Sequence, residues 1–500
     1  MNYRSTRSET MEVSAAQAIR SGIAPDGGLF TPETIPALTQ ADLQALLPLT
    51  YQELAARILS LYLTDFDPAD LERMIAAAYA YPAKWADPAI TPVTRLAEGQ
   101  YVLELFHGPT CAFKDVALQL LPHLMTQSGA LCQDTREIVI LVATSGDTGK
   151  AALEGFRDVP GTRIVVFFPE QGVSDIQRLQ MVTQEGANTA VVAVRGNFDD
   201  AQNGVKQIFT DPAMMARLAR RGMAFSSANS INWGRLAPQL VYYFYGYLEL
   251  CRRGALKLGD PLNVAVPTGN FGNILAAYFA KEMGLPLGKL ICASNSNNVL
   301  TDFIASGAYD RKRPFYTTVS PSMDILISSN LERLLYYLGG QDAAKVRRWM
   351  EQLKSDGAYR VDAATAARIA DRFGGGYASE AETLDTIGRV FRDCGYVMDT
   401  HTAVGKAVYD RYAAASGDRT PVLIAATASP FKFNSSVLRA LSGSPAGEAA
   451  SEFELLEQLH AVSGRPIPAG LRALDQKPVR HDGVCAKEAM AGAVAAILEV

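Results

Sequence analysis

The sequence predicts an open α/β fold in which parallel strands alternate with helices. From about residue 101 onward, short runs rich in β-branched residues alternate with longer helical patterns. The runs are apolar throughout instead of alternating with polar residues, which is typical of strands buried on both faces of a parallel sheet. Parallel strands need crossover helices, and ligands in such folds bind at the carboxyl ends of the strands.

The expected elements follow the chain in order. Residues 1 to about 95 are expected to form helices and loops, with a turn at residues 27–28 and an amphipathic helical stretch at residues 40–62. A cluster of three glycines at residues 374–376 is expected to be a flexible break within a helical region. Six strands are expected at residues 137–143, 163–169, 189–194, 262–269, 289–295 and 421–428.

Length and composition exclude several classes of protein. A chain of 500 residues is expected to form about two to four domains. Its 48% hydrophobic and 20% charged residues are typical of a soluble globular protein. The net charge of −5 argues against general nucleic-acid binding, which needs a basic surface. The longest apolar run, MAGAVAAIL, is far shorter than the roughly 20 residues that span a bilayer, so no membrane partner is expected.

Cysteine and histidine give no sign of a metal site. The six cysteines form no CxxC pair, and the five histidines form no HExxH motif. The first twenty residues are polar and charged where a signal peptide would be apolar, so a cytoplasmic location is expected. The sequence carries no signal for an oligomeric state.

The first candidate site is TSGDTGK at residues 144–150, directly after an expected strand. It is not a P-loop, because Thr144 stands where that motif needs glycine and Ala151 where it needs Ser or Thr. A strand-to-helix turn with hydroxyls and free amides suits an anion. An ordinary helix start capped by Ser145 or Asp147 explains the segment equally well.

Two further segments each allow two interpretations. In GNFGN, at residues 269–273, glycines would let the backbone approach a phosphate, although the GxGxxG spacing is missing and a tight turn alone would explain them. Lys114 lies among apolar neighbours, as an amine nucleophile would, but a surface lysine paired with Asp115 is the simpler interpretation of that segment alone.

Together, these segments resemble the threonine synthases, which are fold type II pyridoxal-phosphate enzymes related to the tryptophan synthase β chain. The resemblance runs from the N-terminus to about residue 433. It rests on the segments STR, GIAPDGGLF, HGPTCAFKD, ATSGDTGKAA, SANSINWGR, PTGNFGN, SNSNNVLTDF, DTHTAVG and ATASPFKF, in this order.

The resemblance implies pyridoxal 5'-phosphate as cofactor and Lys114 as the catalytic lysine that binds it covalently. It also implies that Thr427 faces the pyridine nitrogen. A hydroxyl can donate a hydrogen bond to an unprotonated nitrogen, which favours elimination and replacement over transamination. The cofactor phosphate is expected at Gly269, Asn270, Phe271, Gly272 and Asn273.

The family reaction converts O-phospho-L-homoserine and water to L-threonine and phosphate, by γ-elimination and β-replacement. A phospho-lyase or amino-acid deaminase on the same scaffold, and a noncatalytic homologue that serves as a binding protein, are the alternatives. The resemblance leaves Asp147 as a helix cap or a residue behind the site. Substrate contacts are expected from Ser145, Thr148, Lys150, Asn229, Ser230, Asn232 and Arg235.

The resemblance also implies a division into domains. We expect an N-terminal domain at residues 1–95 and a small domain at residues 131–229. The large cofactor domain is expected to combine residues 96–130 with residues 230–500.

Overall fold

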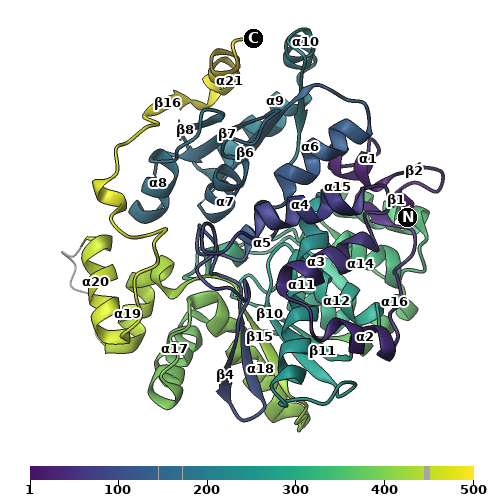
Figure 1. The fold of residues 1–500 in the computed structure, drawn as a ribbon, viewed down its shortest axis with the longest axis vertical. Helices are drawn as coiled ribbons and strands as arrows, with labels where there is room; N and C mark the ends of the chain where they lie inside the picture. Colours follow the sequence, from purple (N-terminus) through teal and green to yellow (C-terminus); the bar gives the residue numbers. More distant parts are fainter. Residues whose placement is uncertain (145, 172, 444–450) are drawn as a thin grey trace.

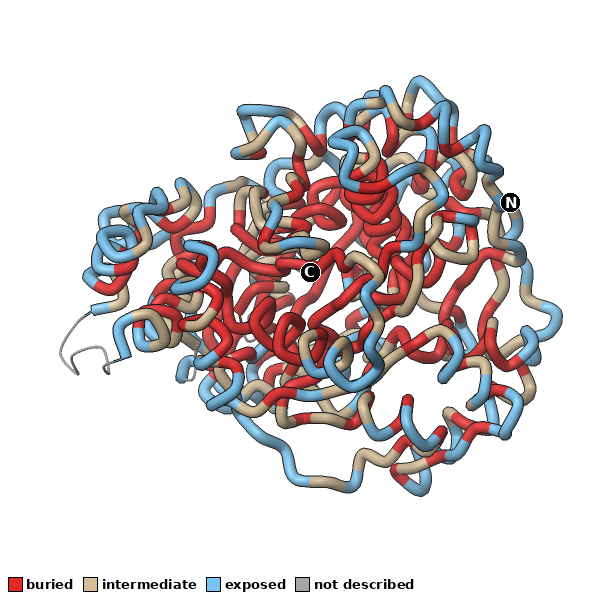
Figure 2. The backbone as a smooth tube through the Cα atoms, turned by 90° about the horizontal axis from the view of Figure 1, so that it is seen from below, coloured by how far each residue is buried: buried red, intermediate tan, exposed pale blue. Residues whose placement is uncertain are grey.

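The computed structural model describes residues 1–144, 146–171, 173–443 and 451–500. Two large sheets dominate it, one in the upper and one in the lower half of Figure 1, with helices packed around both. In the tube of Figure 2, the buried segments lie in the interior and the exposed ones at the periphery.

The lower sheet has six strands in the order β14-β11-β10-β15-β5-β4. All neighbours in it are parallel except β4 and β5, which form an antiparallel pair. Two parts of the chain that are far apart in the sequence form this sheet: one contributes β4 and β5, and the other contributes β10, β11, β14 and β15. The two parts meet where β15 pairs with β5. The strands are β4 (Val93–Ala97), β5 (Gln100–Glu104), β10 (Leu262–Pro267), β11 (Leu287–Ser294), β14 (Phe373–Tyr377) and β15 (Val422–Ala426).

The upper sheet has five strands, all parallel, in the order β16-β8-β7-β6-β9. Its edge strand β16 comes from the end of the chain, so the C-terminal segment leaves the lower half and returns to the upper one (Figure 1). The expected domain boundaries remain a prediction. Strand β16 lies in the expected large domain by its residue numbers, but it pairs with a strand from residues 131–229. The strands are β6 (Glu137–Ala143), β7 (Thr162–Pro169), β8 (Thr189–Arg195), β9 (Met223–Ser226) and β16 (Gly483–Ala486).

Small sheets and helices complete the fold. Two small antiparallel sheets consist of β1 (Tyr3–Ser5), β2 (Glu12–Val13) and β3 (Phe30–Pro32), and of β12 (Ala308–Asp310) and β13 (Ala358–Arg360). The helices are α1 (Ala15–Ser21), α2 (Gln40–Leu46), α3 (Tyr51–Ser60), α4 (Pro68–Ala78), α5 (Lys114–Leu118), α6 (Leu121–Leu131), α7 (Asp147–Phe156), α8 (Asp175–Val182), α9 (Phe198–Thr210), α10 (Pro212–Arg220), α11 (Trp233–Arg252), α12 (Gly272–Glu282), α13 (Val299–Ser306), α14 (Leu331–Leu338), α15 (Ala343–Ser355), α16 (Ala363–Arg372), α17 (Glu380–Cys394), α18 (Thr400–Ser416), α19 (Asn434–Ser442), α20 (Glu452–Ser463) and α21 (Met490–Leu498).

Helix α11 lies at the centre of the molecule. It is buried along nearly its whole length, as expected for a helix that carries aromatic and aliphatic side chains on every side. It packs against α3, α5 and α12, so it connects the N-terminal helices with the helices that follow β10.

The six expected strands are confirmed, each within two residues at either end. The expected break at residues 374–376 is wrong, because these glycines lie inside β14. The small size of Gly376 is needed for packing, since a Cβ at this position would lie 2.7 Å from the side chain of Val408 in α18. The helical stretch at residues 40–62 is two helices, α2 and α3, interrupted at Pro48.

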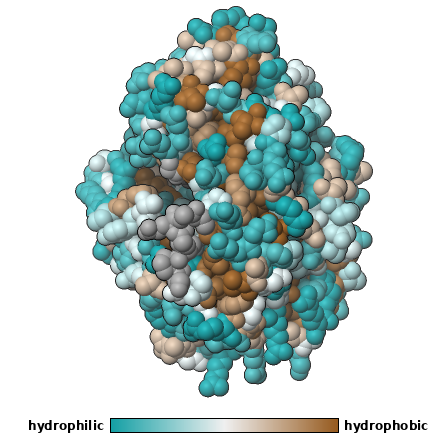
Figure 3. Space-filling view, turned by 90° about the vertical axis from the view of Figure 1, so that its left-hand side faces the viewer, coloured by the Kyte–Doolittle hydropathy of each residue, from teal (hydrophilic) through white to brown (hydrophobic). Residues whose placement is uncertain are grey.

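None of the helices in the described ranges is long and apolar enough to cross a membrane. Figure 3 shows the side of the molecule at the left of Figure 1, where brown apolar atoms lie between teal hydrophilic rims.

Candidate active site

Lys114 is the first residue of α5 and lies next to the end of β15. The amide of Phe113 donates a hydrogen bond of 2.9 Å to the carbonyl of Thr427, and Ala112 forms a bridge with Ala428. These contacts bring Lys114, the predicted catalytic amine, close to Thr427, the residue predicted to face the pyridine nitrogen. Burial lowers the pKa of Lys114, because the charged ammonium loses solvation, although Asp147 acts in the opposite direction.

Asp147 forms a buried ion pair that the sequence did not reveal. Its carboxylate lies 2.7 Å from Nζ of Lys432 and 3.7 Å from Nζ of Lys114. Burial alone would raise the pKa of Asp147, but the two lysines outweigh it and hold that pKa well below its usual range. The side chain of Lys432 is completely buried and also donates to the carbonyl of Thr110 at 3.0 Å.

Asp147 does not cap its helix, which is one of the two roles that the sequence allows for it. The N-cap position of α7 is Gly146, and no side chain caps it. Instead, Oγ1 of Thr144 accepts hydrogen bonds from the amides of Gly146 and Gly149, each at 3.0 Å. Ser145, the other predicted cap and a predicted substrate contact, lies outside the described residues.

The turn from β10 to α12 is shaped to receive an anion. Phe271 has a left-handed backbone with φ of 64° and precedes the first helical residue, Gly272, without any side-chain cap. Asn273 accepts hydrogen bonds from the hydroxyls of Tyr242 and Tyr243, which leaves its Nδ2 buried and without a partner among the described residues. Buried donors are nearly always satisfied in folded proteins, so this one fits a bound acceptor such as a phosphate oxygen.

The remaining predicted positions of this turn, Gly269 and Asn270, pack against a long loop. A Cβ on Gly269 would lie 2.8 Å from the carbonyl oxygen of Ser322, so only glycine fits there without movement. The carbonyl of Asn270 accepts hydrogen bonds from both the amide and Nδ2 of Asn330, at 3.1 and 3.2 Å. Nδ2 of Asn330 also donates to the carbonyl of Ser230 at 3.2 Å. This fully buried asparagine, which the sequence did not reveal, ties two predicted ligand-binding turns together.

Arg235 is a buried guanidinium in the first turn of α11. Nη1 donates to the carbonyl of Ala228 at 3.0 Å, while Nε is buried and has no partner. No carboxylate pairs with Arg235 among the described residues. Burial lowers its pKa to about 10. Arg235 is close enough to Lys114 to help lower the pKa of that amine.

The other predicted substrate contacts differ in their burial and in whether they have a hydrogen-bond donor free for a ligand. Asn232 is completely buried, and its Nδ2 donates to the carbonyls of Ile19 and Ser227 while its Oδ1 accepts from Gly234, so no donor is left for a ligand. Asn229 is exposed, and Thr148 is partly exposed. Lys150 points into a separate cavity, where its Nζ lies 3.2 Å from Glu154 and also bonds Gln184.

A chain of hydrogen bonds reaches Lys114 from the opposite side. Its Nζ donates to Oγ of Ser322 at 3.4 Å, and the amide of Ser322 donates to Nε2 of His401 at 3.2 Å. Since Nε2 accepts a bond, the proton of His401 is on Nδ1, which lies 3.0 Å from a carboxylate oxygen of Asp399. His401 thus has both ring nitrogens satisfied, as expected for a structural histidine.

Three family models match successive parts of the chain. The model of the threonine synthase N terminus matches residues 2–79, that of pyridoxal-phosphate dependent enzymes matches residues 89–428, and that of the threonine synthase C-terminal region matches residues 402–491. The chain belongs to the threonine synthase family.

Individual proteins that are similar to this chain also belong to the threonine synthase family. Threonine synthase of Saccharomyces cerevisiae is 38% identical over 88% of this chain and 89% of its own. Human threonine synthase-like 1 is 42% identical over 95% of this chain, which spans only 64% of that longer protein. The crystal structure of PLP-bound threonine synthase from Brucella melitensis superposes with a TM-score of 0.88 at 37% identity, and each chain is covered completely.

The fold is that of the fold type II pyridoxal-phosphate enzymes, and pyridoxal phosphate is the cofactor of this threonine synthase family member. The residues present fit that group. The β10–α12 turn offers an uncapped helix start and the free amide of Asn273 to its phosphate, and Lys114 offers a buried amine.

Proposed function

We propose that this protein is a threonine synthase that converts O-phospho-L-homoserine and water to L-threonine and phosphate. The observation that carries the proposal is Arg235, a buried guanidinium near Lys114 without a carboxylate partner among the described residues. An unpaired buried charge is costly, so it favours an anionic ligand. The cofactor phosphate has its own turn at residues 269–273, which leaves Arg235 for the phosphate of the substrate.

The cofactor, when bound, would withdraw electrons from the substrate carbon that carries the amino group, which makes the proton on that carbon acidic and then a proton on the next carbon. The chain's own residues then have to move those protons. Lys114 suits this task, because its lowered pKa makes the neutral amine available as a base. The carboxylate of Asp147, 3.7 Å from Nζ of Lys114, stabilises the protonated amine once a proton has been taken up, whereas Lys432 acts in the opposite direction.

The phosphate group that leaves needs a partner that stabilises its charge. A guanidinium can bind phosphate through two parallel N–H donors, and in a buried site this interaction is strong. We assign this role to Arg235, with Ser145, Thr148, Asn229 and Ser230 as proposed polar contacts around it. We propose that Asn232 positions these residues by capping α11, and we leave Lys150 out of the substrate site.

The test is turnover of O-phospho-L-homoserine by the purified, cofactor-loaded protein. We expect equal amounts of inorganic phosphate and threonine, and no product from the Lys114→Ala variant. A deaminase or phospho-lyase would give a 2-oxo acid in place of threonine, which amino-acid chromatography distinguishes. A binding protein would release no phosphate at all. Either of these results would disprove the proposal.

The Arg235→Gln variant tests the assigned phosphate contact. We expect the KM for the substrate to rise at least about tenfold, since a charge-assisted contact to the substrate is lost, while cofactor binding is unchanged. Arg419→Glu is a matched control, because Arg419 is exposed and has no partner among the described residues. If Arg235→Gln weakened the cofactor and the substrate equally, Arg235 would belong to the cofactor site.

A further inference from the structure

A large cavity lies beside the site of Lys114 but is separate from it. Its volume is about 740 Å³, within the range of small-molecule sites. Cys111 and Ser429 line it, whereas Lys114, Asn273 and Thr427 do not. The amide of Ser429 donates a hydrogen bond of 3.0 Å to the carbonyl of Cys111, so these two residues contact each other.

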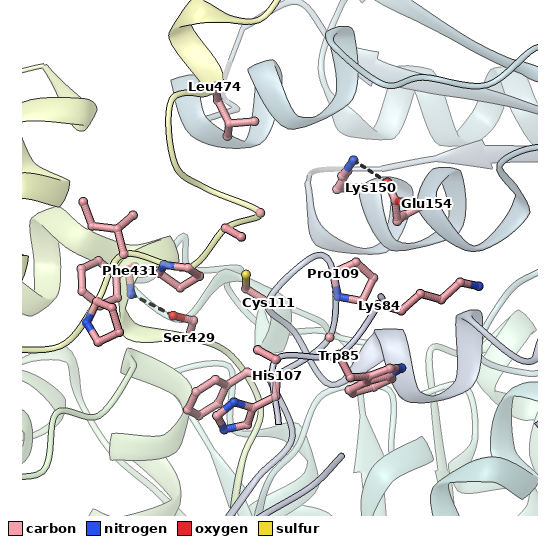
Figure 4. A pocket seen from close by; sticks show the side chains of 18 of the residues that line it. Lys84, Trp85, His107, Pro109, Cys111, Lys150, Glu154, Ser429, Phe431 and Leu474 are labelled. Atoms are coloured by element: carbon pink, nitrogen blue, oxygen red, sulfur yellow. Dashed lines mark hydrogen bonds and ion pairs between the residues drawn. The ribbon is translucent and has the colours of Figure 1, made fainter. Parts of the chain in front are cut away.

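Several separate parts of the chain build this cavity. Figure 4 shows Lys150 and Glu154 of α7 on one side, Ser429 and Phe431 on the other, and Leu474 in the C-terminal segment above. The segment from residue 465 to residue 477 closes one side as it passes from α20 towards β16. Apolar groups, among them Trp85, form much of the remaining wall.

The acidic groups of the cavity are already paired within the protein. Glu104 lies 2.7 Å from Nε2 of His107. Glu154 pairs with Lys150 at 3.2 Å and with Arg157 at 3.1 Å. Glu185, the third carboxylate of the lining, lies 3.7 Å from Arg480 and 3.9 Å from Arg157. Each carboxylate of the cavity therefore has a partner within the protein.

Three cations of the cavity have no carboxylate partner among the described residues. They are Lys84, Arg465 and Lys477, and they come from two distant parts of the chain. Lys84 is partly buried, and burial lowers its pKa although Glu154 acts in the opposite direction. Arg465 and Lys477 are exposed. Positive charges that line a cavity with apolar walls favour an anion that carries an apolar body.

We propose that this cavity is a binding site for a small organic anion, distinct from the sites of cofactor and substrate. The apolar body of the ligand lies between Trp85 and Leu474, and its carboxylate or similar group lies towards Arg465 and Lys477. The proposal does not depend on the proposed function, since neither Lys114 nor Arg235 lines the cavity.

Calorimetric titration of the cofactor-loaded protein with 2-naphthoate tests the proposal, with uncharged 2-naphthamide as the matched ligand. We expect one 2-naphthoate per chain and at least about tenfold weaker binding of 2-naphthamide, because the amide cannot pair with the free cations. Absence of saturable binding at one ligand per chain would overturn the proposal, as would equal affinity for the two compounds.

Variants then locate the bound anion. The double variant Arg465→Glu and Lys477→Glu should weaken 2-naphthoate at least about tenfold and leave 2-naphthamide unchanged. Ala469→Phe, at an exposed position that lines the cavity, should weaken both compounds by filling the space. Lys257→Glu, at an exposed lysine outside the cavity, should change neither. Binding of 2-naphthoate that survives both the double variant and Ala469→Phe lies elsewhere and contradicts the proposal. Circular dichroism and the cofactor absorbance check that each variant is folded and loaded.

Discussion

Two strand-to-helix turns of this chain differ in how they interact with negative charge. The turn from β10 to α12 has an uncapped helix start and a buried amide donor on Asn273 without a partner. The turn from β6 to α7 has its amides bonded by Thr144 and brings its own anion, Asp147, beside Lys114. The first turn is open to an anion from solution, whereas the second has its anion built in.

The difference lies in a few side chains and not in the backbone pattern. Both turns follow a buried parallel strand, contain glycines and open a helix, and for these reasons both were candidate anion sites from the sequence. A helix start binds an external anion only where the protein does not supply an internal acceptor. The following predictions test this contrast, from the largest expected effect to the smallest.

Lys432→Met should have the largest effect, on stability. The substitution leaves the buried carboxylate of Asp147 with only the more distant Lys114, and breaking a buried ion pair costs about 3 kcal/mol. We expect the free energy of unfolding of the cofactor-free protein, measured in urea, to fall by about this amount. The double variant with Asp147→Asn should recover part of the loss. A loss below about 0.5 kcal/mol would mean that the pair is not important for the fold.

Asn273→Asp should damage the open turn. A carboxylate at this position replaces the free donor with a negative charge, and like charges repel the cofactor phosphate. We expect the Kd for pyridoxal phosphate, from absorbance titration of the cofactor-free protein, to rise about a hundredfold, which corresponds to about 2.7 kcal/mol. Asn273→Ala, which removes the donor without adding charge, should cost about tenfold. Equal effects of the two variants would argue against an anion at this turn.

These side chains also show what the sequence could predict and what it could not. The strands, Lys114 and the glycines of the β10–α12 turn could be predicted because each depends on its own local pattern. Lys432 could not, since its partners Asp147 and Thr110 are distant in the sequence and only the fold brings them together. Its one local signal, a lysine in an apolar segment, is the same as that of Lys114.

Two other positions were missed for related reasons. Asn330 acts through the carbonyls of Ser230 and Asn270, and backbone acceptors leave no trace in a sequence. The glycines of β14 were interpreted as a break, because the sequence does not show that Val408 packs against them. Local patterns thus predict elements and motifs, whereas the pairing of buried polar groups depends on packing across the chain.

Thr144→Val should have a moderate effect that is confined to stability. Valine keeps the shape of the side chain but cannot accept the amides of Gly146 and Gly149, so these donors lose their buried partner. We expect the free energy of unfolding to fall by about 1–2 kcal/mol, while the Kd for pyridoxal phosphate changes less than about twofold. A large loss of cofactor affinity would show that the β6–α7 turn also contributes to anion binding.

Asp147→Asn breaks the same buried ion pair as Lys432→Met, so it should also lower stability. Its effect on Lys114 is the smallest of those predicted here, a change in the pH at which the cofactor attaches. Attachment requires the neutral amine, and Asp147 favours the charged form, so its removal should lower the pKa of Lys114 further. The midpoint of the attachment rate against pH, followed by cofactor absorbance, should therefore move to lower pH. Lys432→Met removes a cation that disfavours the charged amine, so its midpoint should move to higher pH. If both variants moved the midpoint in the same direction, the charge of Asp147 would not control the pKa of Lys114. The two turns would then differ in shape but not in their effect on charge.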